Sequence, residues 1–283
     1  MQPLFPAILI FGDSTADTGN NNYHLQTIFK AMHLPYGVDL PGHEASGRFS
    51  NGKLISDIIA SKLNIKDLVP PFLQPNISDQ DIVTGVCFAS AGAGYDDRTS
   101  LSSKAIPVSQ QPSMFKNYIA RLKGIVGDKK AMEIINNALV VISAGPNDFI
   151  LNFYDIPTRR LEYPTIYGYQ EFVLKRLDGF VRKLVKKLPE IEASLPGSKF
   201  LYANVYDPLM DMIQNPSKYG FKETKKGCCG TGYLETTFMC NPLTKTCPNH
   251  SDHLFGTQFI PQKLLTITLD NFVDAQIRGW IKA

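Results

Sequence analysis

The chain has little of what would indicate a nucleic-acid or membrane partner. Its 29 Lys and Arg residues against 26 Asp and Glu residues give a net charge of only +3, whereas nucleic-acid-binding domains usually carry a clustered positive excess. No apolar run approaches the roughly 20 residues that cross a bilayer, and no basic segment followed by a long apolar one opens the chain. We therefore expect no nucleic acid, no transmembrane segment and no retained signal peptide.

The chain also lacks internal repeats, low-complexity linkers and any Cys-x-x-Cys or paired-His spacing. Its 283 residues, 43% of them apolar, suffice for one large α/β domain or two small ones. The absence of a linker favours a single domain over residues 1–283.

The five cysteines are unevenly distributed along the chain. Cys87 lies alone in an apolar segment, and the other four crowd into residues 228–247. They are Cys228, Cys229, Cys240 and Cys247. Two local disulfides are expected, and three pairings are open, although adjacent cysteines would take different partners. A zinc site is the competing interpretation, but the ligand spacing typical of such sites is missing.

The most informative segment is residues 11–19, Phe-Gly-Asp-Ser-Thr-Ala-Asp-Thr-Gly, which follows the apolar run 7–10. This pattern predicts a buried strand, then a tight turn leading into a helix. Ser14 would then lie at the carboxyl end of a strand, where open α/β sheets bind their ligands. The alternative is that Gly-Asp-Ser is ordinary turn chemistry with a helix cap.

Two more predicted strands end in polar or small-residue turns. Residues 83–89 precede Ser-Ala-Gly-Ala-Gly at 90–94, which contains Gly92, and residues 138–144 precede Gly-Pro-Asn-Asp at 145–148, which contains Asn147. The spacing leaves room for helices that make the strands parallel, so the three turns should lie along one edge.

Other predicted elements are helices at 53–63, capped by Ser50 or Asn51, at 110–124, and at 128–137, capped by Asp128. Further along we expect a long helix at 169–194, a strand at 199–205 and helices at 208–213 and 272–280.

Together, the strand-end Ser, the Gly in a small-residue turn and the Asn in a Gly-x-Asn-Asp turn resemble the plant GDSL esterase/lipases of the SGNH hydrolase superfamily. The likeness covers residues 6–184 and 190–255. Its motifs lie at residues 11–22, 47–52, 85–94, 143–149, 215–221 and 226–232.

This resemblance implies a three-layer α/β/α sandwich with a central, mainly parallel sheet. It implies that Ser14 attacks a carboxylic ester and forms an acyl-enzyme, without a metal or cofactor. The backbone N–H groups of Ser14 and Gly92 and the amide of Asn147 would form the oxyanion hole, where one donor is worth about 3 to 4 kcal/mol. It further implies secretion and a small-molecule or lipid ester as substrate, and two sequons, at Asn76 and Asn249, agree weakly with export.

The base of the expected triad is where the chain departs from the family. The family carries its acid and base in a Trp-Asp-x-x-His-Pro block, but residues 256–261 here read Gly-Thr-Gln-Phe-Ile-Pro. Asp252 and His253 precede that position and are adjacent, so they lack the spacing that lets the family's Asp and His meet. We do not expect them to substitute.

A second departure lies within the predicted helix 169–194. Family members insert a strand ending in Gly-Leu-Pro-Pro and a long helix between the elements that resemble residues 180–184 and 188–196. Both are absent here, so we expect a sheet without one central strand, with exposed edges, a weakened core and poor solubility.

Two readings of function follow. The first is that the chain descends from GDSL-type serine esterases and is impaired by the missing Asp and His. The alternative is a catalytically dead ester-binding or non-functional variant. For this polypeptide, the missing base favours the alternative. A purely structural protein held by the 228–247 loop would leave the Ser, Gly and Asn turns unexplained.

The genetic code offers an origin for the altered block. Codons GGN-ACN-CAR-TTY-ATH-CCN-CAR-AAR for residues 256–263 become TGG-NAC-NCA-RTT-YAT-HCC-NCA-RAA when one T is added in front. This frame forces Trp and permits Asp-Ser-Ile-His-Pro-Ser-Glu. We hypothesise a frameshift over residues 256–270, either a genuine allele or an error in the gene model.

Sequencing the transcript across the codons for residues 250–275 tests the error hypothesis. We expect an additional T directly after the Phe255 codon if the shift is an error. A GGN codon that follows the Phe255 codon without interruption would instead establish the altered block as genuine.

Overall fold

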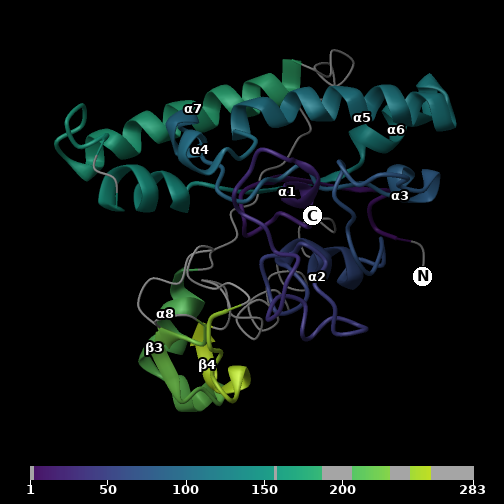
Figure 1. Cartoon of the computed structure of the whole chain (residues 1–283). Coiled ribbons are helices and arrows are strands. Elements are labelled where there is room, and N and C mark those ends of the chain that lie inside the picture. Colours follow the sequence, from purple (N-terminus) through teal and green to yellow (C-terminus); the bar gives the residue numbers. More distant parts are fainter. Residues whose placement is uncertain (1–2, 156–157, 187–205, 230–242, 256–283) are drawn as a thin grey trace. The chain divides into compact units, whose positions relative to one another are not determined.

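The computed structural model describes residues 3–155, 158–186, 206–229 and 243–255 (Figure 1). The chain divides into two compact units. Unit 1 comprises Met1–Phe29 and Val69–Lys199, and unit 2 comprises Lys30–Leu68 and Phe200–Ala283. Within the described ranges, none of the helices combines the length and the hydropathy of a membrane span.

Unit 1 holds a parallel strand pair and most of the helices. Its strands are β1 (Ile8–Gly12) and β2 (Leu139–Ser143). Its helices are α1 (Asn20–Tyr23), α3 (Asp79–Val83), α4 (Asp97–Ser103), η1 (Val108–Gln110), α5 (Gln111–Val126), α6 (Asp128–Asn136), the π-helical η2 (Asp148–Asp155) and α7 (Ile166–Lys186).

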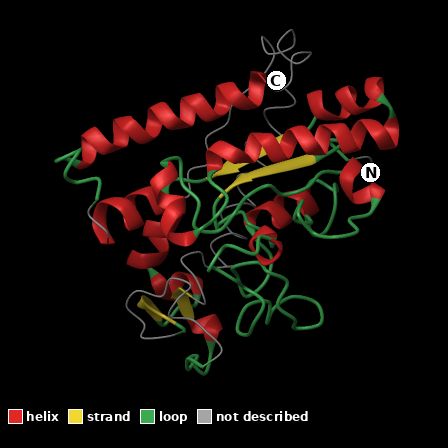
Figure 2. Cartoon of the chain, turned by 45° about the horizontal axis from the view of Figure 1, so that its top comes forward, coloured by secondary structure: helices red, strands yellow, loops and turns green. Residues whose placement is uncertain are grey.

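Strands β1 and β2 pair in parallel, with Ile8 opposite Leu139 and Gly12 opposite Ser143. Figure 2 shows the pair as two yellow arrows that run side by side. Because the long connection between them carries helices, this arrangement is that of an α/β fold, as the sequence predicts.

The strand expected at 83–89 is only partly formed. Its backbone follows the free side of β1, where the Ile10 N–H donates to the Val86 carbonyl at 3.1 Å and the Phe88 N–H to the Ile10 carbonyl at 2.7 Å. The pairing is an isolated bridge at Cys87, since Val83 ends α3 and Gly85 has a φ of +97° that interrupts extended backbone.

The core of unit 1 lies between β1 and α5. All five residues of β1 are buried, and α5 turns the buried side chains of Phe115, Tyr118 and Leu122 inward. The Phe11 ring stacks on Phe88 at 4.9 Å and meets Phe115 edge-on at 5.7 Å. The apolar spacing of α5 therefore covers one face of the strand that leads to Ser14.

Unit 2 contains α2 (Ile55–Lys62), α8 (Tyr206–Gln214), η4 (Pro216–Tyr219), β3 (Glu223–Gly227), η5 (His250–Asp252) and β4 (His253–Phe255). At the start of α2, the buried Asp57 carboxylate accepts the Leu54 N–H at 2.9 Å and forms a two-bond ion pair with Arg48 at 2.8 and 2.9 Å. Strands β3 and β4 pair in parallel, beside a small core of Met212, Phe221 and Leu254.

The predicted helices at 53–63, 110–124, 128–137 and 208–213 are confirmed as α2, α5, α6 and α8. Two predicted caps are wrong. Helix α2 is capped at Leu54, not at Ser50 or Asn51, because Asp57 reaches back to its N–H; α6 is capped at Gly127, which leaves Asp128 in the first turn. The predicted helix 169–194 is described to Lys186, and the elements at 199–205 and 272–280 lie outside the described residues.

One face of β2 exposes apolar side chains. Within the described ranges β2 pairs with β1 alone, and Val140 and Ile142 of β2 are 46% and 36% exposed. Alternate side chains of a strand point to the same face of a sheet, so Val140 and Ile142 lie together on the more exposed face of β2.

Gln111 joins α5 to the end of β1, and its loss should destabilise the protein. Its buried amide oxygen accepts the Gly12 N–H at 2.9 Å, and its amide nitrogen donates to the Gly12 carbonyl at 2.7 Å. Gln111→Ala leaves a buried N–H unpaired, so we expect a loss of about 2 to 4 kcal/mol in the free energy of unfolding, measured by urea denaturation. The exposed neighbour Gln110→Ala, as matched control, should stay within about 0.5 kcal/mol; equal midpoints for both variants would contradict this role.

Candidate active site

Ser14 lies in the turn directly after β1, and this turn is fixed to the end of β2. The Asp13 N–H donates to the Ser143 carbonyl at 2.9 Å. Gly12 has a φ of +138°, and a side chain there would overlap the same carbonyl oxygen. Ser14 itself is half-buried, and neither its hydroxyl nor its N–H has a hydrogen-bond partner among the described residues.

The Asp13 side chain stabilises the turn through hydrogen bonds within it. One oxygen of its buried carboxylate accepts the Thr15 N–H at 2.9 Å and the Thr15 hydroxyl at 2.8 Å, and that hydroxyl lies 2.6 Å from the Ser143 hydroxyl. Burial raises the pKa of Asp13 to about 6, against the lowering effect of the Thr15 hydrogen bonds. Asp13 therefore acts as an acceptor that holds the shape of the loop around Ser14.

Two further side chains join the Ser14 turn to the turn at 90–94. The buried Asp17 carboxylate accepts the Ala91 N–H at 3.0 Å, and its pKa is raised to about 6 by burial. Asn21 donates its amide to the Ala91 carbonyl at 2.9 Å and accepts the Ser90 hydroxyl at 2.5 Å. The backbone contributes as well, because the Ser90 N–H donates to the Gly12 carbonyl at 3.1 Å.

Gly92 occupies a position that only glycine fits. Its φ is +85°, and an added Cβ would lie 2.6 Å from the ring of Phe29 and 2.8 Å from the Cβ of Ser103. Its carbonyl accepts the Ser103 hydroxyl at 3.2 Å, whereas its N–H has no acceptor in the described part of the chain.

The third turn is bonded to the second. The Asn147 amide donates to the Ala93 carbonyl at 2.9 Å. The buried Asp148 carboxylate accepts the N–H groups of Tyr95 and Asp96 at 2.9 and 3.0 Å and the Thr99 hydroxyl at 2.6 Å. Burial raises the pKa of Asp148 to about 6, in spite of these donors.

The expected convergence of the three turns is therefore confirmed. Each turn donates hydrogen bonds to, or accepts them from, another, so Ser14, Gly92 and Asn147 lie on one hydrogen-bonded edge of unit 1. The structure thus brings together the three residues singled out from the sequence, at a sheet edge of the kind where α/β folds bind ligands.

Asp252 and His253 lie in unit 2 and have other partners there. Lys222 donates to the Asp252 carboxylate at 2.8 Å, which lowers the pKa of Asp252. The Nδ1 of His253 lies 3.2 Å from the Asn249 carbonyl, to which it donates, so this nitrogen is not bonded to a carboxylate as it is in a Ser-His-Asp triad. Residues 256–261, the position at which the resemblance leads us to expect the acid and base, lie outside the described residues.

The residues that hold the turns together were not predicted from the sequence. Asp17, Asn21 and Asp148 lie within the motifs at 11–22 and 143–149, and a polar side chain able to accept successive backbone N–H groups is the signal that could have found them. Gln111 has no local signal, because its partner Gly12 is 99 residues away.

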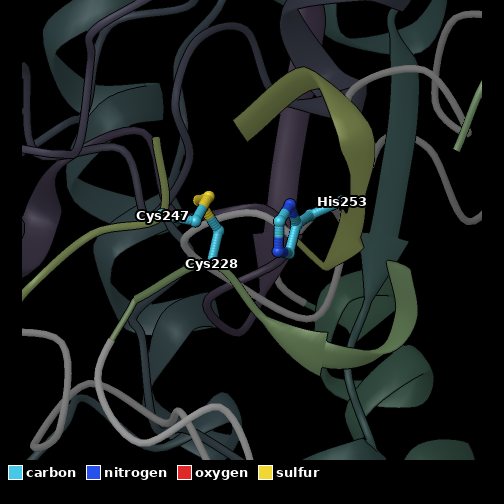
Figure 3. A group of neighbouring side chains, drawn as sticks. All are labelled: Cys228, Cys247 and His253. Atoms are coloured by element: carbon cyan, nitrogen blue, oxygen red, sulfur yellow. A yellow bond between two sulfur atoms is a disulfide. The ribbon is translucent and has the colours of Figure 1, made fainter. Parts of the chain in front are cut away.

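The cysteine pairing left open by the sequence is partly resolved. Cys228 and Cys247 form a disulfide, Cys229 is also disulfide-bonded, and the buried Cys87 is free. Adjacent cysteines thus do not pair with each other. Among the described residues, one group of side chains is close enough to hold a metal ion, namely Cys228, Cys247 and His253 (Figure 3).

Comparisons with known proteins match the chain to one kind of protein. The family model for GDSL-like lipase/acylhydrolase matches residues 8–206. Three Arabidopsis thaliana proteins named GDSL esterase/lipase (At2g30310, At2g30220 and At2g24560) are 76%, 73% and 64% identical to this chain. The matches cover 100%, 99% and 99% of this chain and 92%, 92% and 91% of the relatives.

The first of these matches extends over 331 residues, whereas this chain has 283. At least 48 aligned positions are therefore filled only in the relative. The family model covers more than half of the chain and the relatives cover all or nearly all of it. The chain therefore belongs to the plant GDSL esterase/lipase family, which supports an ester hydrolase with an α/β fold.

Proposed function

We propose that the edge formed by the three turns is an ester-hydrolysing site in which Ser14 is the nucleophile. The Ser14 hydroxyl would attack the carbonyl carbon of a carboxylic ester, expel the alcohol and form an acyl-enzyme that water then hydrolyses. The N–H groups of Ser14 and Gly92 and the second N–H of the Asn147 amide would stabilise the oxyanion. No step in this sequence calls for a metal or cofactor.

One observation carries this proposal: the bonding of the three turns leaves their candidate donors available. Asp17 and Asn21 take up the N–H and carbonyl of Ala91, while the adjacent Gly92 N–H and the Ser14 N–H have no partner in the described ranges. Asn147 uses one amide hydrogen for the Ala93 carbonyl, and the second has no acceptor among the residues that the structure describes. Donors held in place in this way need no reorganisation when charge develops on a substrate oxygen.

We further propose that this polypeptide is impaired because its base is missing. Residues 256–261 contain neither Asp nor His, and the His253 Nδ1 donates to a backbone carbonyl instead of a carboxylate. The family match ends at residue 206, before this block, and at least 48 aligned positions of a close relative are empty here. A serine hydrolase without its base retains oxyanion stabilisation and loses about 10⁴- to 10⁶-fold in kcat.

A catalytically dead ester-binding protein is the second candidate. The exposed β2 residues Val140 and Ile142 favour it, because the strand that leads to the third turn has one poorly covered face, which weakens the support of that turn. The two candidates share the same oxyanion site and differ in whether Ser14 catalyses hydrolysis of a bound ester.

The substrate class, domain organisation and compartment follow from the same proposal. The substrate would be a small-molecule or lipid ester. The family match runs through residues 30–68 of unit 2 as well as through unit 1, which supports one hydrolase domain over residues 1–283. The Cys228–Cys247 disulfide and the sequon at Asn76, exposed in a turn with a φ of +57°, support secretion.

Hydrolysis of p-nitrophenyl acetate and butyrate tests the proposal. The variants are the unchanged chain, Ser14→Ala, and a chain in which Trp-Asp-Ser-Ile-His-Pro replaces residues 256–261. We expect the restored chain to exceed the unchanged chain by about 10⁴-fold or more in kcat, and to lose that gain when Ser14→Ala is added. Ser14-dependent turnover in the unchanged chain close to that of the restored chain would refute the impairment, and no gain on restoration would favour the dead variant.

The oxyanion role of Asn147 is tested in the restored chain. Asn147→Ala removes one candidate donor, so we expect kcat to fall by about 10² to 10³ with little change in KM. Asn136→Ala, at the exposed end of α6, is the matched control and should keep kcat within a factor of about two. If both variants had the same kcat, Asn147 would have no part in the oxyanion hole.

A further inference from the structure

A compact group of metal-ligating atoms lies in unit 2, independent of the proposed esterase site. The sulfur atoms of Cys228 and Cys247 and a ring nitrogen of His253 all lie within 4.8 Å of one another. Figure 3 shows the imidazole facing the disulfide from β4, with Cys228 directly after β3. Two cysteine sulfurs and one imidazole nitrogen are three of the four ligands of a common tetrahedral zinc site.

The backbone holds this group in place without help from the sulfur–sulfur bond. The Cys228 N–H donates to the Phe255 carbonyl at 3.0 Å, and the Cys247 N–H donates to the Cys228 carbonyl at 2.6 Å. The β3–β4 pairing sets Gly227 opposite Phe255, two residues beyond His253. The two sulfurs should therefore stay close to each other and to the imidazole after reduction.

The tautomer of His253 suits a metal ligand. Because a carbonyl oxygen can only accept, the Nδ1 of His253 carries the hydrogen that it donates to the Asn249 carbonyl at 3.2 Å. The lone pair is then on Nε2. A hydrogen bond from one ring nitrogen to a carbonyl is the usual support of a histidine that binds metal through the other nitrogen.

We propose that reduction of the Cys228–Cys247 disulfide creates a zinc site with Cys228, Cys247 and His253 as ligands. A dithiol or phosphine reductant supplies two electrons and is itself oxidised, while two protons convert the sulfurs to thiols. Zn²⁺ then binds the two thiolates and the imidazole and releases those two protons, and water fills the fourth position. The disulfide and the metal exclude each other, because a disulfide sulfur has no thiolate charge to offer the ion.

Because of the position of the site, replacing the disulfide by zinc would affect the stability of unit 2. Both the disulfide and the metal would tie the segment after β3 to residue 247, beside a described core of Met212, Phe221 and Leu254. A crosslink stabilises a small core because it restricts the unfolded chain. A bound ion stabilises it because the ion binds only the folded chain. Zinc would therefore replace the stabilising effect that reduction removes.

Titration of the full chain with Co²⁺ and Zn²⁺, with and without phosphine reductant, tests the proposal. Bound Co²⁺ reports thiolate ligation by a charge-transfer band and tetrahedral geometry by its visible bands. We expect one Co²⁺ to bind only after reduction and to be displaced by Zn²⁺. His253→Ala and Cys228→Ser should each weaken binding by about tenfold or more, while the control His250→Ala should leave it unchanged.

Two further measurements keep the outcome interpretable. Cys229→Ser should retain the cobalt spectrum, because Cys229 is not one of the three ligands, and thermal unfolding of the oxidised variants checks that each one folds. Zn²⁺ should raise the Tm of the reduced chain and not that of reduced His253→Ala. A cobalt spectrum unchanged by His253→Ala, one that depends on Cys229, or none after reduction would overturn the proposal.

Discussion

The arrangement of the Ser14 edge depends on buried carboxylates and amides that accept or donate backbone hydrogen bonds. Two strands and the extended segment around Cys87 end here in turns, and a turn has no ladder to satisfy its N–H groups. Asp17 and Asn21 supply partners for Ala91, and Asp148 supplies them for Tyr95 and Asp96. Without these side chains, the buried turns would leave several polar backbone groups without water or protein partners, at about 1 to 3 kcal/mol each.

Burying the carboxylates has a cost that depends on pH. The pKa values of Asp13, Asp17 and Asp148 are each raised from 3.8 to about 6, so the folded chain binds more protons than the unfolded chain between those values. Their ionisation therefore subtracts stability as pH rises through about 4 to 6, and the penalty is complete at neutral pH. The packing of the fully buried strand β1 against α5 is one contribution that opposes this penalty.

Periodicity and turn chemistry predicted much of unit 1, because those signals are local. The helices at 111–126 and 128–136 and the strand at 139–143 follow from them, as do the positions of Ser14, Gly92 and Asn147 in turns at one sheet edge. The incomplete strand at 83–89 and the cap at Leu54 were missed since each depends on geometry outside the local pattern: the positive φ of Gly85, and the reach of the Asp57 side chain. Long-range partners such as Gln111 and Gly12 leave no trace in sequence spacing.

The oxyanion site and the base that activates Ser14 depend on different parts of the chain. The described hydrogen bonds that join the three turns to one another come from residues 12–21, 90–99 and 143–148. Oxyanion stabilisation is a property of fixed donors, whereas proton transfer from Ser14 requires a base in reach of its hydroxyl. Loss of the block can therefore remove the second contribution and leave the first intact, and a chain of this kind would keep the charge complementarity of a hydrolase after losing its turnover.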